Sequence, residues 1–249
     1  MEKLANLEGE DSKARTRFAS EEFSRSAEYL CFCLFAIVAH KDSLQRGLAM
    51  FTGLIEEIGN VLWIRATERG TQLQIAAPQV AENIRTGDSL AVNGCCLTVT
   101  ARRAEQITFD LLTETLDRTN LKSLRRDSLV NLERPLLADG RIGGHFVQGH
   151  IDCAARIISL DRASADHRLE IELPAEFAHY AASKGSIAIN GISFTVAEIL
   201  PKSFAVFVIP HTRRSTNLST VQNDDLVNLE FDVLAKYLQR MLPRPPAPG

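Results

Sequence analysis

Short stretches in which polar and apolar residues alternate run through most of the chain after residue 50. The segments Gln72–Pro78 (QLQIAAP) and Arg168–Pro174 (RLEIELP) both show this period of two. Such a period is typical of a β-strand with one buried face. Turn signals such as Asn93-Gly94 separate the stretches. Many short strands at nearly even spacing predict an all-β fold, built as a small closed barrel or a sandwich.

Helical patterns are few. Pro78–Ile84 and Pro174–Ser183 both begin with proline, which is favourable in the first turn of a helix, so we expect a short helix at each place. A longer helix is predicted at Asp232–Leu242, because its apolar residues fall on one face. A helix of this length is marginal in isolation. It must therefore pack on the barrels or on the same helix of neighbouring subunits.

The chain contains an internal duplication. The segment Ser89–Val99 (SLAVNGCCLTV) matches Ser186–Val196 (SIAINGISFTV), and Asn93 matches Asn190 at a spacing of 97 residues. The same spacing relates two copies each of the sequences TNL and LVNLE. A repeat of this length is the size of a domain rather than of a solenoid unit. We therefore predict two similar domains, residues 50–145 and 146–234, followed by a helix and a disordered tail in residues 235–249.

Residues 1–49 have no counterpart in the duplication. Their apolar stretch, Leu30–Ala39, is too short to span a bilayer, which takes about 20 residues. Acidic residues precede it, where a signal peptide would carry basic ones. We expect an N-terminal extension that is disordered or arises from an early start codon, with Met50 as the functional beginning. A helical appendage that packs its apolar face elsewhere is the alternative.

Charge and composition narrow the classes of function. The formal net charge is −3 and 45% of the residues are hydrophobic, which predicts a cytoplasmic globular protein without a nucleic-acid or membrane partner. The five cysteines form no paired framework. Phosphate loops rich in glycine are absent from the sequence. The spacing of His145, His150 and Cys153 fits no standard zinc site, so we expect no metal.

The repeated Asn-Gly turns draw attention to the strands that follow them. In a strand, residues 96 and 98 project to one face, as do residues 193 and 195. The first pair is Cys96 and Thr98, and the second is Ser193 and Thr195. Small polar side chains can satisfy backbone groups near a turn. Their recurrence in both copies favours a ligand-binding wall instead.

Several motifs now combine into a resemblance that runs in order from Met50 to about Leu242. They are FTGLIEEIG, GDSLAVNGCCLTV, TETL, TNL, VNLER, GGHFVQGHID, NGISFTV and VNLEFDVLAKYLQRML. Together with the duplication, these motifs resemble the riboflavin synthase family. The resemblance implies a transferase that passes a four-carbon unit between two molecules of 6,7-dimethyl-8-ribityllumazine. The products are riboflavin and 5-amino-6-(D-ribitylamino)uracil.

The resemblance also implies an architecture. Each half is expected to be a six-stranded Greek-key barrel that holds one lumazine. Three chains form a homotrimer through their C-terminal helices, and the active site lies between the N-barrel of one subunit and the C-barrel of another. The family suggests lumazine synthase as a further partner. No cofactor is expected, because the substrate carries its own electron sink.

Site residues follow from the same motifs. We expect His150 to handle protons, since a histidine titrates near neutral pH. Cys96 or Ser193 could orient a water or add to the ring, and Asp232 could anchor the ribityl chain or His150. The expected catalytic residues are Cys96, His150, Ser193 and Asp232. The expected substrate-binding residues are Ser89, Thr98, Asp110, His145, Lys184 and Thr195.

Two other classes of protein remain in view. A non-catalytic lumazine- or flavin-binding protein, as in luminous bacteria, shares the duplicated fold but has typically lost polar site residues. A flavin reductase barrel would require a separate nicotinamide domain, and the chain has neither the room nor the fingerprint for one.

Overall fold

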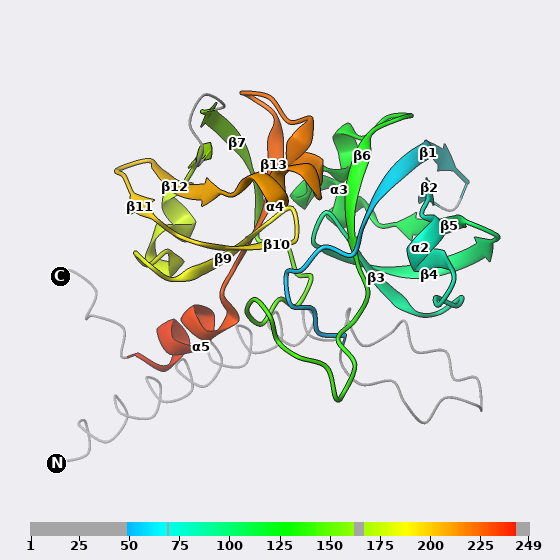
Figure 1. Cartoon of the computed structure of the whole chain (residues 1–249), viewed down its shortest axis with the longest axis horizontal. Coiled ribbons are helices and arrows are strands. Elements are labelled where there is room, and N and C mark those ends of the chain that lie inside the picture. Colours follow the sequence, from blue (N-terminus) through cyan, green and yellow to red (C-terminus); the bar gives the residue numbers. More distant parts are fainter. Residues whose placement is uncertain (1–48, 69, 162–166, 243–249) are drawn as a thin grey trace, which may run out of the picture. The chain divides into compact units, whose positions relative to one another are not determined.

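The computed structural model describes residues 49–68, 70–161 and 167–242. They form two halves of the same β architecture, which follow each other along the chain (Figure 1). The predictions for residues 1–48 and for the tail after residue 242 lie outside the described residues. No helix within the described ranges combines the length and the apolar character needed to cross a membrane.

The N-terminal half is a closed barrel with the strand order β1-β2-β5-β4-β3-β6. Every second side chain points inward, and residues such as Val61, Leu73 and Phe109 fill the interior with no exposed surface. This alternation is the one that the sequence predicts. The strands are β1 (Glu57–Thr67), β2 (Gly70–Ala76), β3 (Ser89–Val92), β4 (Cys95–Arg103), β5 (Gln106–Leu111) and β6 (Leu129–Glu133).

The C-terminal half is a curled sheet with the strand order β10-β9-β13-β7-β8-β12-β11. The two outermost strands, β10 and β11, together correspond to the single strand β4 of the N-terminal half. Val196 and Ala197 separate them, and the backbone N–H of Ala197 donates to Ala205 O at 2.8 Å. The strands are β7 (Cys153–Leu160), β8 (His167–Glu172), β9 (Ser186–Ile189), β10 (Ile192–Thr195), β11 (Glu198–Ile199), β12 (Ser203–Val208) and β13 (Leu226–Phe231).

Short helices lie between the strands. The two that the proline signals predict are α2 (Pro78–Ala81) and the 3-10 helix η2 (Ala175–Tyr180). Others, which the sequence pattern did not predict, precede the last strand of each half. They are α3 (Thr113–Arg118) with η1 (Asn120–Ser123), and α4 (Pro210–Arg214) with η3 (Asn217–Ser219).

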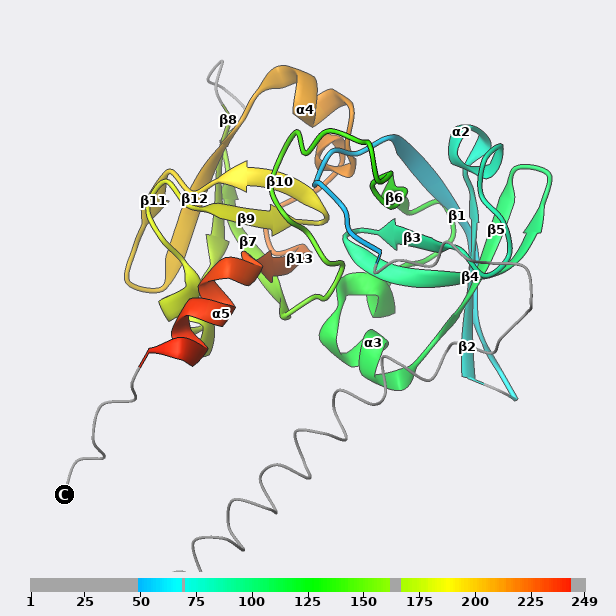
Figure 2. The same cartoon turned by 90° about the horizontal axis from the view of Figure 1, so that it is seen from below.

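The predicted C-terminal helix is α5 (Val233–Met241), which follows β13 on the C-terminal half (Figures 1 and 2). Asp232 caps it by accepting a hydrogen bond from Leu234 N at 2.9 Å. The apolar face of α5 is exposed in the single chain, with Met241 80% accessible. Its exposed apolar residues are Leu234, Tyr237, Leu238, Met241 and Leu242.

Six buried asparagines join the two halves. They occupy equivalent positions in the duplication, and each is at most 5% exposed: Asn93, Asn120, Asn131, Asn190, Asn217 and Asn228. Asn131 Nδ2 donates across the junction to Asn190 O and to Asn217 Oδ1, both at 2.9 Å. Asn228 Nδ2 makes the equivalent bond to Asn93 O at 2.9 Å. Because burying an unpaired amide group costs about 1–3 kcal/mol, this reciprocal pairing fixes how the halves meet.

The two Asn-Gly turns touch at the centre of this network. Asn93 and Gly94 both have positive φ, 48° and 77°, and Asn190 and Gly191 have 47° and 79°. Two successive positive φ values are typical of the tight hairpin turns that asparagine and glycine favour. A Cβ on Gly94 would lie 2.7 Å from Gly191 N. The two turns can therefore approach this closely only because positions 94 and 191 are both glycine.

We predict that Gly94→Ala destabilises the chain more than Gly70→Ala does. Both glycines have positive φ, so both substitutions introduce backbone strain of about 1–3 kcal/mol. A Cβ on Gly70 would meet only Leu111 O at 3.6 Å, whereas one on Gly94 would overlap Gly191. Overpacking adds about 1–3 kcal/mol at Gly94 alone. Urea unfolding midpoints measure the difference, and equal losses in the two variants would contradict the proposed contact.

Candidate functional site

The outer face of the N-terminal half carries a row of polar side chains. In β4, Cys95, Leu97 and Val99 point into the core. Cys96 and Thr98 therefore point outward. Thr98 lies opposite Ser89 on β3. We call the outward side chains Ser89, Cys96, Thr98 and Asp110 the N-wall.

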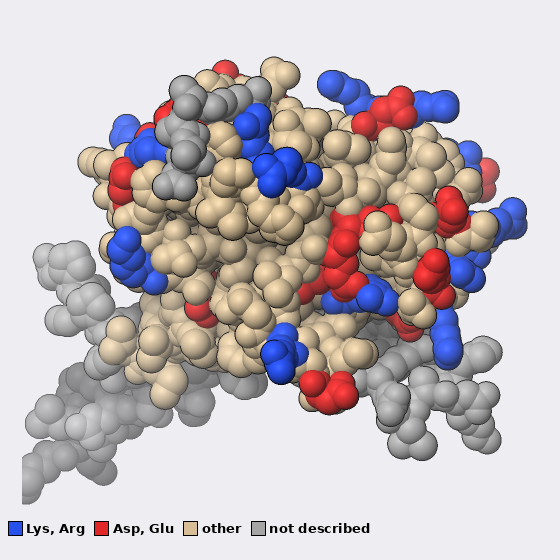
Figure 3. Space-filling model, viewed as in Figure 1, with Lys and Arg blue, Asp and Glu red and all other residues tan. Residues whose placement is uncertain are grey.

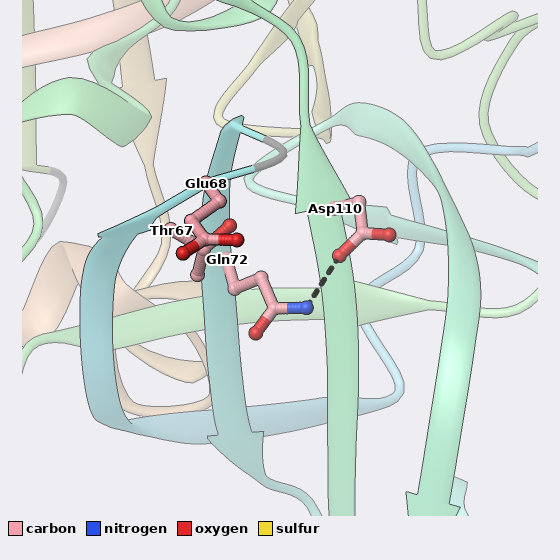
Figure 4. A pocket seen from close by; sticks show the side chains of 4 residues that line it. All are labelled: Thr67, Glu68, Gln72 and Asp110. Atoms are coloured by element: carbon pink, nitrogen blue, oxygen red, sulfur yellow. Dashed lines mark hydrogen bonds between the residues drawn. The ribbon is translucent and has the colours of Figure 1, made fainter.

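Asp110 continues this row on the neighbouring strand β5. Val99 pairs with Phe109, which places Asp110 beside Thr98. On its other side Asp110 faces Gln72, whose Nε2 donates to Asp110 Oδ1 at 2.9 Å (Figure 4). An open hollow of about 320 Å³ lies here, lined by Thr67, Glu68, Gln72 and Asp110. The hollow thus adjoins the N-wall only at Asp110.

The C-terminal half has an equivalent wall with different side chains. Ser193 and Thr195 point outward from β10, and Thr195 lies opposite Ser186 on β9. At the position of Asp110 stands Phe207, which is 48% exposed. We call Ser186, Ser193, Thr195 and Phe207 the C-wall. The prediction from sequence omitted Ser186 and Phe207, although their spacing of 97 residues from Ser89 and Asp110 could have identified them.

Each half is preceded by a short segment that lies on the surface of the other half. We call Phe51–Glu56 the N-strap and Val147–Asp152 the C-strap. Phe51 and Val147 form a β-bridge with each other. The N-strap then lies on the C-wall, because Ser193 N donates to Gly53 O at 2.9 Å, and the C-strap lies on the N-wall, because Cys96 N donates to Gly149 O at 2.9 Å. Each half therefore supplies a segment to the surface of the other.

His145 accompanies the C-wall. The backbone N–H of His145 donates to Thr52 O at 3.1 Å, and the ring Nδ1 shares a hydrogen bond of 2.7 Å with Ser193 Oγ. Burial lowers the pKa of His145, and the nearby Asp232 carboxylate partly opposes this effect. The imidazole is therefore neutral near pH 7, and its Nδ1 lies at hydrogen-bond distance from the Ser193 hydroxyl.

His150 accompanies the N-wall. It follows Gly149 in the C-strap, next to the point where that strap bonds to Cys96. The residue is exposed in the single chain, yet partial desolvation lowers the pKa of His150, Lys236 lowers it further, and Asp152 opposes both effects. The equivalent position of the N-strap holds Leu54. The two walls are thus equipped differently, with Cys96 near His150 on one and Ser193 near His145 on the other.

Lys184 and Asp232 have backbone roles as well as charged side chains. Lys184 has a φ of 66° in a turn where the first copy has Gly87, a conformation that is strained for a lysine. Such strain at a polar, exposed residue suggests a functional constraint. Asp232 caps α5 and acts electrostatically on His145. The Asp232 carboxylate thus acts on His145 rather than on His150.

Two other cysteines within the described ranges, Cys95 and Cys153, are less suited to chemistry. Burial raises the pKa of Cys95 to about 12 and also that of Cys153 to about 12. Cys96 is the cysteine that points outward on the N-wall. In the described part of the chain, no three histidine, cysteine, aspartate or glutamate residues gather into a group that could hold a metal ion. On the face in Figure 3, acidic and basic side chains are interspersed.

Comparison with known proteins places this arrangement in a family. The lumazine binding domain family matches residues 52–135 and 148–232. The chain is 42% identical over 198 residues to the riboflavin synthase of Actinobacillus pleuropneumoniae, covering 80% of this chain and 92% of that one. It is 43% identical over 199 residues to the riboflavin synthase of Mycobacterium tuberculosis, covering 78% and 98% respectively.

Solved structures share the fold. The crystal structure of LumP complexed with 6,7-dimethyl-8-(1'-D-ribityl) lumazine superposes with a TM-score of 0.67 at 24% identity, covering 73% of this chain and 98% of that one. LumP complexed with riboflavin gives a TM-score of 0.68 at the same identity. At this level of identity the comparison establishes the shared fold alone.

We predict that both histidines titrate on the acidic side of their ordinary pKa of 6.5, because burial lowers that value in each. A folded-state pKa below the unfolded one means that protonation favours the unfolded chain. Each histidine should therefore reduce stability as the pH falls below 6.5. Ring ¹⁵N NMR between pH 8 and 5 measures the midpoints, assigned with His145→Asn and His150→Asn. A midpoint above 6.5 at either ring would overturn the expected neutral state.

Proposed function

Because this chain belongs to the riboflavin synthase family, we propose that it converts two molecules of 6,7-dimethyl-8-ribityllumazine into riboflavin and 5-amino-6-(D-ribitylamino)uracil. A four-carbon unit leaves one lumazine and joins the other. The two products together contain all the atoms of the two substrates. The reaction therefore needs no outside oxidant or reductant, and we assign it no cofactor.

The observation that carries this proposal is the pair of matched walls. Two identical substrates require two similar sites, and the duplication supplies Ser89-Cys96-Thr98 and Ser186-Ser193-Thr195 at equivalent positions. Their short polar side chains suit ring carbonyls and ribityl hydroxyls. Holding two reactants in the right geometry can contribute about 7–11 kcal/mol to catalysis.

The differences between the walls suit an asymmetric reaction. One lumazine gives carbon and the other accepts it, so equal sites would not distinguish donor from acceptor. We assign His150, which is neutral near pH 7, to proton transfer at the C7 methyl group. We assign Ser193, which has His145 Nδ1 at 2.7 Å, or Cys96 to the addition or water-orienting step at C7.

Substrate binding is assigned to the remaining polar residues. Ser89, Thr98 and Asp110 serve the N-wall, and Thr195 and Lys184 serve the C-wall, while His145 connects that wall to the N-strap. For Asp232 we propose that it caps α5 and sets the electrostatic environment of His145. Because both walls are open surfaces of the single chain, we propose that the N-wall of one subunit faces the C-wall of another.

Incubation of the purified chain with the lumazine tests this function. Riboflavin and the uracil product should appear in equal amounts, each at half the rate at which the lumazine disappears. A protein that binds the lumazine without forming riboflavin would instead be a non-catalytic binder, the function for which the LumP complexes give a structural precedent.

Lys184→Gly offers a sharp test of the C-wall. The positive φ of residue 184, 66°, suits glycine, so we expect the substitution to leave stability within about 1 kcal/mol of the parent. Loss of the ammonium group should lower kcat/KM by about tenfold or more, because a charge-assisted hydrogen bond contributes about 1.5–3 kcal/mol. Lys184→Arg is the matched control and should retain most of the activity. A glycine variant with parental kcat/KM would remove Lys184 from the site.

The exposed face of α5 supports a homotrimer in which the three α5 helices pack together. We predict that Leu238→Glu dissociates the assembly, because it places a charge in the middle of a face where Leu238 is 63% exposed in the single chain. Gln239→Glu adds the same charge on the other side of the helix and should leave the trimer intact. Light scattering after size exclusion measures the mass, and activity should fall with the trimer. A monomeric parent, or a trimeric Leu238→Glu variant, would contradict this assembly. Association with lumazine synthase and a cytoplasmic location stay predictions.

A further inference from the structure

Carboxyl groups fix the C-strap at both of its ends, one of them buried and the other half-buried. At the first end, Glu230 is 2% exposed. Its Oε1 accepts a hydrogen bond from Gln148 N at 2.7 Å, and its Oε2 accepts one from Gly149 N at 2.9 Å. At the second end, Asp152 Oδ2 accepts from Phe231 N at 2.8 Å and pairs with Lys236 Nζ at 2.7 Å. The groups that hold the C-strap therefore belong to β13, which contributes Glu230 and Phe231, and to α5, which contributes Lys236.

His150 lies between these two anchors. Directly before it, Gly149 O accepts a hydrogen bond from Cys96 N at 2.9 Å. A Cβ on Gly149 would lie 2.5 Å from Cys96 Cβ, so the strap is in tight contact with the N-wall. The backbone of His150 therefore has little freedom to move relative to Cys96.

From this geometry we infer that Glu230 is a positioning residue for the reaction, because its carboxyl group holds the backbone of Gln148 and Gly149, and Gly149 in turn fixes His150 next to the strap's contact with Cys96. Hydrogen bonds from N–H groups to an ionised carboxylate are about twice as strong as neutral ones, and burial raises the pKa of Glu230 to about 7, so the strap is held most firmly above that pH. Without them, the two N–H groups before His150 would lose their partners. The inference rests on the role that we propose for His150 in the conversion of the lumazine.

The duplication supplies a matched control. Glu133 holds the N-strap in the same way, with Oε1 accepting from Thr52 N at 2.6 Å and Oε2 from Gly53 N at 3.0 Å. The residue that follows, Leu54, stands where the C-strap has His150. Loosening either strap should cost similar stability, but only the C-strap carries the histidine.

The experiment compares Glu230→Gln, Glu133→Gln, His150→Ala and the double variant Glu230→Gln/His150→Ala in the full chain. We expect Glu230→Gln to lower kcat by about 10- to 100-fold, since a displacement of about 1 Å can have an effect of that size, with KM changed by less. The double variant should be no slower than His150→Ala, because both substitutions remove the same contribution. The ring NMR resonances of His150 should shift in Glu230→Gln and stay in place in Glu133→Gln.

Two results would overturn the inference. One is a Glu230→Gln variant with parental kcat and unmoved His150 resonances. The other is a double variant that is slower than His150→Ala by the full factor seen for Glu230→Gln alone, which would mean independent effects. Should Glu230→Gln fail to fold, Glu230→Asp keeps the carboxyl group but shortens the side chain, and the same two results decide. A parent that forms no riboflavin would refute the proposed function instead, while the NMR comparison would still test the positioning.

Discussion

The arrangement of both walls depends on the close contact between the Asn-Gly turns. Gly94 and Gly191 approach so closely that neither tolerates a Cβ, and the asparagine network around them leaves one way for the halves to meet. Buried amides are costly when unpaired and directional when paired. In a purely apolar junction the two halves could slide past each other. The hydrogen bonds between the asparagines instead set the position of each strap on the opposite wall.

The exchange of straps follows from that junction. Each strap bridges the halves, because it leads into one half and lies on the wall of the other. Glu133 and Glu230 hold the two straps through the same pair of backbone bonds. The backbone around the two straps is therefore nearly symmetric, and the two sites differ there through the side chains placed on equivalent positions.

Those differences are concentrated where a ligand would contact the chain. The fold presents His150 on one strap and Leu54 on the other, and Asp110 on one wall where the other has Phe207. The core positions of the two halves, in contrast, are filled by similar apolar residues. A duplicated gene can thus keep one packing solution while its two sites diverge, which is what a reaction between identical substrates with unequal roles requires.

Much of the fold and of the candidate site could be predicted from the sequence by itself. The period-two pattern and the spacing of 97 residues determined the β class, the two halves and the shared strand face of Cys96 with Thr98 and of Ser193 with Thr195. These features are local or repeat along the chain. The gap between β10 and β11, the pairing of His145 with Ser193 and the pairing of Glu230 with the C-strap were decided only by the tertiary structure. The two pairings join residues 48 and 82 positions apart, and the relative placement of the two halves that creates them leaves no periodic trace in the sequence.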